Sequence, residues 1–162
     1  MNPATLESKK AIVEKITKSF EENPAMVIVE YRGLTVAELS KLRKSLKEVG
    51  ASFNVYKNTL VTKASANLGI KDLEQYYSGS NAYVFSKDVI NGPKALVKFA
   101  KKNENLVIKA GYIEGNTYDA AGVKTIASLP GREGLISMFL SCLQAPIRKF
   151  ACTVKAVADS KN

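Results

Sequence analysis

The stretch AMVIVEYRGLTVAELSKLRKSLKEVGASFNVYKNTL, residues 25–60, carries the pattern that decides the fold. Residues 25–31 are mostly apolar and β-branched, which predicts a largely buried strand. Thr35 and Glu38 then form a T-x-x-E capping box, which is a signature of a helix start. The stretch therefore opens with a strand that is followed, after a tight connection, by a helix.

This predicted helix has one apolar stripe and an otherwise basic surface. Gly50 suits the left-handed residue just beyond the helix end. Residues 51–56 then alternate apolar with polar side chains, the period of a half-buried strand. The stripe, which we expect to pack on the sheet, consists of Val36, Leu39, Leu42, Leu46 and Val49, and the cations around it are Lys41, Arg43, Lys44 and Lys47.

Helical and strand patterns alternate on both sides of this stretch. The expected elements are a helix at 5–22, a helix at 58–68 capped by Asn58, a short helical piece at 71–77, a strand at 81–86, a helix opening at Asn91, a strand at 106–112 and a helix that Asp119 caps and that runs to about Ala127. This order favours an α+β fold, a ferredoxin-like sandwich of a small sheet with packed helices, plus an extended C-terminal helix. Because strands and helices alternate, an α/β fold with a parallel or mixed sheet is the alternative.

The pattern changes after Leu129-Pro130-Gly131. Residues 132–144 and 146–160 are both helical in pattern, Pro146 is expected to divide them, and no strand follows. A helix that is not followed by another strand of the sheet needs another surface on which to bury its apolar side. We therefore predict a globular RNA-binding domain at 1–130 and a C-terminal helical docking segment at 131–162.

The composition indicates a partner that carries phosphate. Twenty-four Lys and Arg against fifteen Asp and Glu give a net charge of +9 and a pI near 9.5. Such a basic domain tends to meet nucleic acid or an anionic membrane, although a solvated basic surface is the simpler explanation. No stretch approaches the ~20 apolar residues of a membrane span, and residues 1–10 lack the apolar core of a signal peptide. A soluble cytoplasmic protein is expected.

Several chemistries are poorly supported. The chain has no histidine, the commonest general acid or base, and no phosphate-binding or nucleophile-elbow motif. Its two cysteines, Cys142 and Cys152, form no C-x-x-C pair, so a zinc site is not expected, and we expect both thiols to be buried. We predict a protein that is not an enzyme and needs no metal or cofactor.

The charge concentrates between residues 32 and 63, where seven cations stand against two carboxylates. Two connections in this region combine a cation with small or polar residues before a helix start: 32–35 (RGLT) and 57–59 (KNT). Backbone N–H groups at a helix start attract phosphate, and Asn or Thr side chains can contact sugars and bases. If the two predicted strands are neighbours, both connections open at one end of the sheet. Capping and turn residues occur at every such junction, so an ordinary structural role is the competing interpretation.

Co-linear motifs make the chain resemble the family of bacterial large-subunit ribosomal protein ten, the stalk-base protein, which is homologous to the P-zero proteins. The motifs are YRGLT (31–35), LRK (42–44), VYKNTL (55–60), FS (85–86), KAG (109–111), EG (114–115), LPGREGL (129–135) and API (145–147). They span nearly the whole chain. The resemblance implies a structural ribosomal protein that is located in the cytoplasm, in the ribosome.

The resemblance also implies particular partners. The N-terminal domain of the family binds the GTPase-associated region of large-subunit rRNA beside ribosomal protein eleven, and the C-terminal helix binds dimers of the acidic stalk protein seven/twelve, which recruit translational GTPases. Carried onto this chain, the motifs imply RNA contacts at Arg32, Gly33, Leu34, Thr35, Lys57, Asn58 and Thr59. Charge adds Lys9, Lys10, Arg43 and Lys63 to the expected RNA-binding residues.

The C-terminal segment has the spacing of a docking helix. An apolar stripe is formed by Ile147, Phe150, Ala151, Val154, Val157 and Ala158, whereas Arg148, Lys149 and Lys155 lie off it. The resemblance implies that a dimer occupies roughly ten residues of such a helix, so we expect two dimers. Packing of this stripe on the domain core is the alternative. For the whole chain, the alternatives are an RNA-binding module outside the ribosome and a protein scaffold whose charge is incidental.

Overall fold

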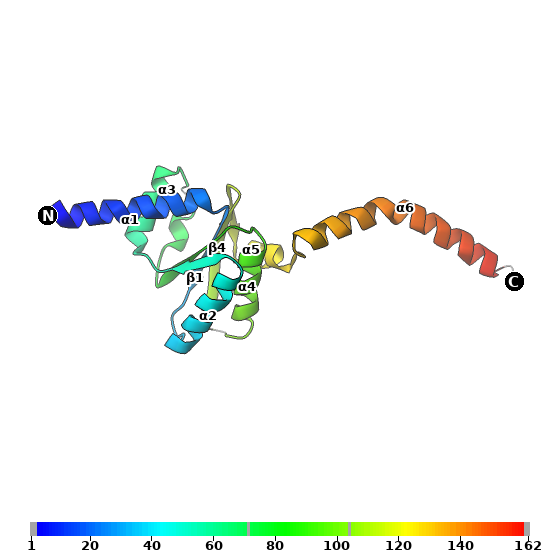
Figure 1. Ribbon diagram of the computed structural model, residues 1–162, viewed down its shortest axis with the longest axis horizontal. Coiled ribbons are helices and arrows are strands. Elements are labelled where there is room, and N and C mark those ends of the chain that lie inside the picture. The colour runs from blue at the N-terminus through cyan, green and yellow to red at the C-terminus, as the bar shows by residue number, and fades with distance from the viewer. Residues whose placement is uncertain (1–2, 71, 104, 161–162) are drawn as a thin grey trace. The chain divides into compact units, whose positions relative to one another are not determined.

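The structure is a computed structural model that describes residues 3–70, 72–103 and 105–160. The chain forms two compact units, one at Met1–Ser128 and one at Leu129–Asn162, within these described ranges. The first unit holds a sheet with its helices, and the second consists of one long helix and the residues before it (Figure 1).

The N-terminal unit is built on a five-stranded sheet of order β2-β3-β1-β4-β5. The strands are β1 (Ala25–Glu30), β2 (Ala51–Asn54), β3 (Asn81–Ser86), β4 (Val107–Ile113) and β5 (Asn116–Asp119). All neighbouring strands pair antiparallel. The predicted α+β class is therefore confirmed, and the parallel alternative is wrong.

Helices cover both faces of this sheet. The helices are α1 (Pro3–Glu22), α2 (Val36–Glu48), α3 (Asn58–Asn67), α4 (Asn91–Ala100) and α5 (Ala120–Ser128) (Figure 1). Met26 and Ile28 of β1 pack with α1 and α3, whereas Val27 and Val29 pack with α2, α4 and α5. A strand that is buried on both faces is apolar throughout instead of alternating, which explains the continuous apolar run of β1.

Two crossings give the unit its ferredoxin-like arrangement. The chain passes from β1 through α2 to β2, and from β3 through α4 to β4, and both helices lie on the same sheet face. Helix α3 and a short 3-10 turn at Glu74–Tyr76 stand between β2 and β3. The turn lies within the short helical piece predicted at 71–77, of which residue 71 is outside the described residues.

Sequence patterns misjudged two features of this unit. The edge strand β5 was not predicted, because its sequence NTYD is short and polar. Asp119 is its last residue, and the helix predicted to follow Asp119 is present as α5. Val36 was assigned to the buried stripe of α2 but is 81% exposed, while Leu42 and Leu46 are fully buried. Val36 is the first residue of α2, whereas the buried Leu42 and Leu46 lie further along it.

The C-terminal unit contains α6 (Arg132–Ser160), which continues through Pro146. The predicted division into two helices is therefore wrong. A proline inside a helix removes one hydrogen bond and bends the axis, and α6 bends near its middle (Figure 1). Cys142 and Cys152 are exposed on this helix, contrary to the expectation of buried thiols. Both lie on a helix whose described side chains are almost all exposed.

Candidate nucleic-acid interface

A groove between α1 and α3 brings together five of the predicted RNA-binding residues. It has a volume of about 680 Å³, and its floor includes the apolar side chains of Val13 and Leu60. Glu14 is the carboxylate among its lining residues. The five predicted residues that line it are Lys9 and Lys10 of α1 and Lys57, Thr59 and Lys63 at the start and on the surface of α3.

Asn58 has a different role from the predicted helix cap. Lys57 occupies the N-cap position of α3, and no side chain caps the helix. The Asn58 side chain donates from Nδ2 to the carbonyl oxygen of Gly79 (2.9 Å) and accepts at Oδ1 from the Tyr83 hydroxyl (3.2 Å). The capping prediction is therefore wrong, and Asn58 ties the start of α3 to the loop before β3.

Lys109, on strand β4, also contacts the loop before β3. Its Nζ lies 2.8 Å from Glu30 Oε2 and donates to the carbonyl oxygen of Ser78 (2.8 Å) and to Asn81 Oδ1 (3.1 Å). Asn81 is 3% exposed, so its side-chain oxygen has little access to water. Together, Lys109 and Asn58 position the loop at residues 78–80 beside the groove.

Replacing Lys109 by Met is expected to lower the free energy of unfolding by about 1–3 kcal/mol, because the buried Asn81 oxygen loses its donor and Glu30 loses its ion pair. Lys124→Met, which removes an exposed lysine of α5, is the matched control and should change stability by no more than about 0.5 kcal/mol. Urea unfolding followed by circular dichroism measures both values. Equal stabilities of the two variants would contradict the assigned role of Lys109.

Residues 32–35 form a second locus, in which the predicted contact residues also serve the fold. Gly33 has φ +92°, which only glycine adopts readily, and its carbonyl oxygen accepts from Asn105 Nδ2 (3.0 Å). Leu34 packs against the core beneath α2. The Arg32 side chain is exposed and is therefore accessible to a ligand.

Thr35 starts α2 through the predicted capping box. Its backbone N–H and its hydroxyl each donate to Glu38 Oε2 (2.8 Å), and the backbone N–H of Glu38 donates to Thr35 Oγ1 (3.4 Å). These hydrogen bonds from the Thr35 backbone and then its side chain lower the pKa of the Glu38 carboxyl. The box is therefore confirmed, and it accounts for Thr35 without a ligand.

The two loci open at the same end of the sheet, although for a different reason than expected. Strands β1 and β2 are not neighbours, because β3 lies between them. Each pairs antiparallel with β3, so β1 and β2 run in the same direction and both following connections leave near the start of β3. The helices that follow, α2 and α3, cover opposite faces.

Arg43, another predicted RNA-binding residue, is on α2, and its guanidinium lies 5.4 Å from the centre of the Phe53 ring.

The predicted partner-binding residues all lie on α6, where they are exposed. They are Ile147, Phe150, Ala151, Val154, Val157 and Ala158. The structure extends their stripe towards the start of the helix, because Ile136, Leu140 and Leu143 continue the alternating steps of three and four residues. These seven large side chains of the stripe, from 136 to 157, are each at least half exposed, and their spacing is that of a helix-packing seam.

Sequence reasoning counted the end of the preceding helix toward docking but named none of its side chains, and it missed the apolar floor of the groove. The upstream half was detectable, since its spacing continues across Pro146. The groove was not, because nothing local in α1 or α3 indicates that the two helices are neighbours. In the part of the chain that the structure describes, no group of side chains suits a metal ion, and no helix is long and apolar enough to cross a membrane.

Comparison with known proteins gives a consistent result along the chain. A family model described as ribosomal protein L10 matches residues 4–101, and one described as the C-terminal region of ribosomal protein uL10 matches residues 129–162. The chain is 49% identical to large ribosomal subunit protein uL10 of Macrococcus caseolyticus, over 100% of this chain and 95% of that protein. It is 48% identical to the Bacillus licheniformis protein of the same name, over 98% and 96%.

Proposed function

The chain belongs to the family of large ribosomal subunit protein uL10, and from this premise we propose that its N-terminal unit binds the GTPase-associated region of large-subunit rRNA while α6 anchors stalk-protein dimers. Membership makes the protein a structural, non-enzymatic component of the large ribosomal subunit, located in the ribosome. In the proposal, the N-terminal unit lies beside ribosomal protein eleven on that RNA.

The groove between α1 and α3 is the observation that carries the RNA proposal. Four lysines and Thr59 converge on it from two helices, against one carboxylate. Lysine ammonium groups neutralise phosphates, and Lys57 is the N-cap of α3, whose first backbone N–H groups are not capped by a side chain. Arg32, which follows β1 at the same end of the sheet, offers a further cation outside the groove. These groups favour recognition of the RNA backbone over recognition of base sequence.

The docking proposal rests on the exposed seam of α6. Ile147 and Phe150 are 73% and 72% exposed, which is unusual for such large apolar side chains unless a partner covers them. A helix of this kind binds in an apolar groove through anchors at steps of three and four. Arg148, Lys149 and Lys155 beside the seam complement an acidic stalk protein. Two dimers fit along α6, and through them the protein recruits translational GTPases indirectly.

Binding to a transcript of the GTPase-associated region should depend strongly on salt. If cations between residues 32 and 63 neutralise about five phosphates, the plot of log affinity against log salt should have a slope of roughly −3.5 to −4.5. Filter binding at several salt concentrations measures this slope. A slope near zero, with micromolar binding intact at high salt, would exclude a phosphate-dominated site.

Replacing Arg32 and Lys57 together by Ala tests the two loci directly. Both side chains are exposed, so the fold should persist while the affinity for the transcript falls strongly. The variant Lys149→Ala/Lys155→Ala removes the same charge from α6 and should bind the transcript like the unchanged protein. If the Arg32/Lys57 variant also keeps full affinity, the RNA site lies elsewhere on the chain.

A further inference from the structure

The outer surface of α2 and α4 is the most basic part of the N-terminal unit, although the groove lies on the other sheet face. This surface, the α2–α4 face, consists of α2, α4 and the two lysines directly after α4. It has eight cations and two carboxylates, a net charge of +6, whereas α1 and α3 with the Lys57 cap have six cations and four carboxylates, a net of +2. Its cations are Lys41, Arg43, Lys44, Lys47, Lys94, Lys98, Lys101 and Lys102, and its carboxylates are Glu38 and Glu48.

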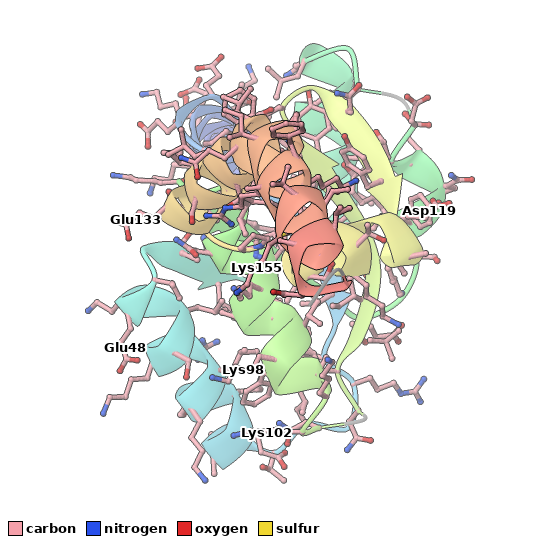
Figure 2. The ribbon with its side chains drawn as sticks, turned by 90° about the vertical axis from the view of Figure 1, so that its right-hand side faces the viewer. Glu48, Lys98, Lys102, Asp119, Glu133 and Lys155 are labelled. Atoms are coloured by element: carbon pink, nitrogen blue, oxygen red, sulfur yellow. The ribbon has the colours of Figure 1, made fainter. Side chains whose placement is uncertain are left out.

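Folding brings these cations together from two separate segments. Helices α2 and α4 lie side by side on one face of the sheet. Lys94 and Lys98 are four residues apart, so they lie on one side of α4, about 6 Å apart along its axis. Lys101 and Lys102 follow directly after the end of α4. Figure 2 shows Lys98 of α4 and Lys102, just beyond the end of α4, on the side of α2, with Glu48 apart from both.

Few of these charges are compensated by carboxylates among the described residues. In the described ranges, the single ion pair joins Lys109 to Glu30, and the charge of Lys41 contributes only a minor part to the lowered pKa of Glu38. Glu38, one of the two carboxylates, accepts hydrogen bonds from the backbone N–H and the hydroxyl of Thr35. Clustered like charges repel one another and raise the free energy of the free protein. A polyanion on this face would relieve that repulsion.

The face is continuous with the Arg32 locus. The hydrogen bond between Asn105 Nδ2 and the Gly33 carbonyl oxygen (3.0 Å) joins the connection after α4 to the connection before α2. Because α2 and α4 run antiparallel, the end of α4 with Lys101 and Lys102 lies at the start of α2. Arg32 therefore belongs to this side of the sheet, and the groove residues belong to the other.

The composition of the face suits RNA better than a protein. Seven of its eight cations are lysines, which are depleted at protein interfaces. Val36 is the only large apolar side chain that is exposed among the described residues of α2 and α4. A protein interface needs an apolar centre, whereas backbone phosphates need only cations.

We propose that the α2–α4 face is a second RNA-binding surface, which holds a segment of ribosomal RNA by its phosphates while the groove between α1 and α3 holds another. The protein thus contacts RNA from both faces of its sheet. The inference rests on the proposed function only in taking ribosomal RNA as the ligand, and it assigns contacts to α4, where the family motifs indicate none.

The test uses the full chain and a transcript that spans the GTPase-associated region with its flanking helices. Lys94→Gln/Lys98→Gln/Lys102→Gln should weaken binding about tenfold or more at near-physiological salt and make the salt slope shallower by about 2–3. The matched control, Arg148→Gln/Lys149→Gln/Lys155→Gln, removes three charges from α6 and should leave affinity and slope unchanged. Thermal unfolding confirms that both variants are folded.

A groove variant, Lys9→Gln/Lys10→Gln/Lys63→Gln, separates this inference from the proposed function. If both triple variants weaken binding and their effects on log affinity add, two independent surfaces are supported. If only the groove variant weakens binding, the second surface is refuted and the proposed function stands. If only the α4 variant does, the second surface stands and the groove site fails. If the Lys94→Gln/Lys98→Gln/Lys102→Gln variant loses binding to purified stalk protein while its RNA binding is unchanged, the α2–α4 face is a protein interface and the inference is overturned.

Discussion

A chain that ends at Ala145 is expected to lose all measurable binding to stalk-protein dimers. The deletion removes four of the seven large side chains of the α6 seam, including Ile147 and Phe150. The remaining helix would begin at Arg132 and have about 14 residues, a length at which isolated helices are marginal in water. The three upstream anchors would therefore no longer be presented on a stable helix. Size-exclusion chromatography with purified stalk protein measures the loss.

The same truncation should leave RNA affinity and the thermal unfolding temperature nearly unchanged. Among the described residues, neither core cluster of the N-terminal unit contains a side chain from α6. If the truncated chain unfolds, the seam was part of the core and the docking proposal fails. In the intact complex, native mass spectrometry should find two dimers. One dimer or three would contradict the length argument but leave the docking role in place.

Single substitutions on α6 test the seam more finely. Phe150→Ala removes a large exposed anchor, and such central aromatic residues often cost about 2 kcal/mol or more of binding free energy. Thr153→Ala is the matched control, because the Thr153 hydroxyl only donates to the Lys149 carbonyl within the same helix. Isothermal titration with stalk protein should distinguish the two variants clearly. Similar affinities would place the contact on another side of α6.

Leu42→Ala is expected to destabilise the N-terminal unit by about 2–5 kcal/mol, the second large effect. Leu42 is fully buried between α2 and the sheet, in the cluster that includes Val27 and Leu96. Removing its side chain loses transfer free energy and leaves a cavity that rigid neighbours fill only in part. Urea unfolding of the chain should show a lower midpoint with an unchanged slope.

Two neighbouring substitutions give the scale for this effect. Thr35→Ala should cost about 1 kcal/mol, because α2 loses its capping box. Val36→Ala should change stability by no more than about 0.5 kcal/mol, since that side chain is 81% exposed. The sequence pattern placed Val36 and Leu42 on one apolar stripe, but only Leu42 is buried. Comparing the two substitutions therefore tests whether burial, and not membership of the stripe, determines the loss of stability. Equal losses of stability for Val36→Ala and Leu42→Ala would show that the buried face of α2 is assigned wrongly.

Local patterns were sufficient for most of the fold. The apolar run of β1, the Thr35–Glu38 box and the glycine after α2 predicted a strand, a helix start and a helix end, and all three are present. These signals are reliable because each depends on residues within one turn or one strand. The co-linear motifs likewise indicated the family that the comparisons show.

Patterns failed where a neighbour from elsewhere in the chain decided the outcome. Asn58 had the residue type of a helix cap, but Gly79 and Tyr83 engage its side chain. Pro146 predicted a helix end, yet α6 continues with a bend, because an exposed helix can leave a carbonyl to water. The short strand β5 exists only because β4 offers it a hydrogen-bonding edge.

The sequence by itself determined the order and type of most elements, the net positive charge and the seam of α6, because periodicity, capping and composition are properties of contiguous residues. Only the tertiary structure decided which basic helices are neighbours. The insertion of β3 between β1 and β2 places α3 against α1 on one face and α2 against α4 on the other. Strand order depends on contacts between residues far apart in the chain, and no local pattern encodes it. The division of the cations into a groove and a second face therefore follows from the topology of the sheet.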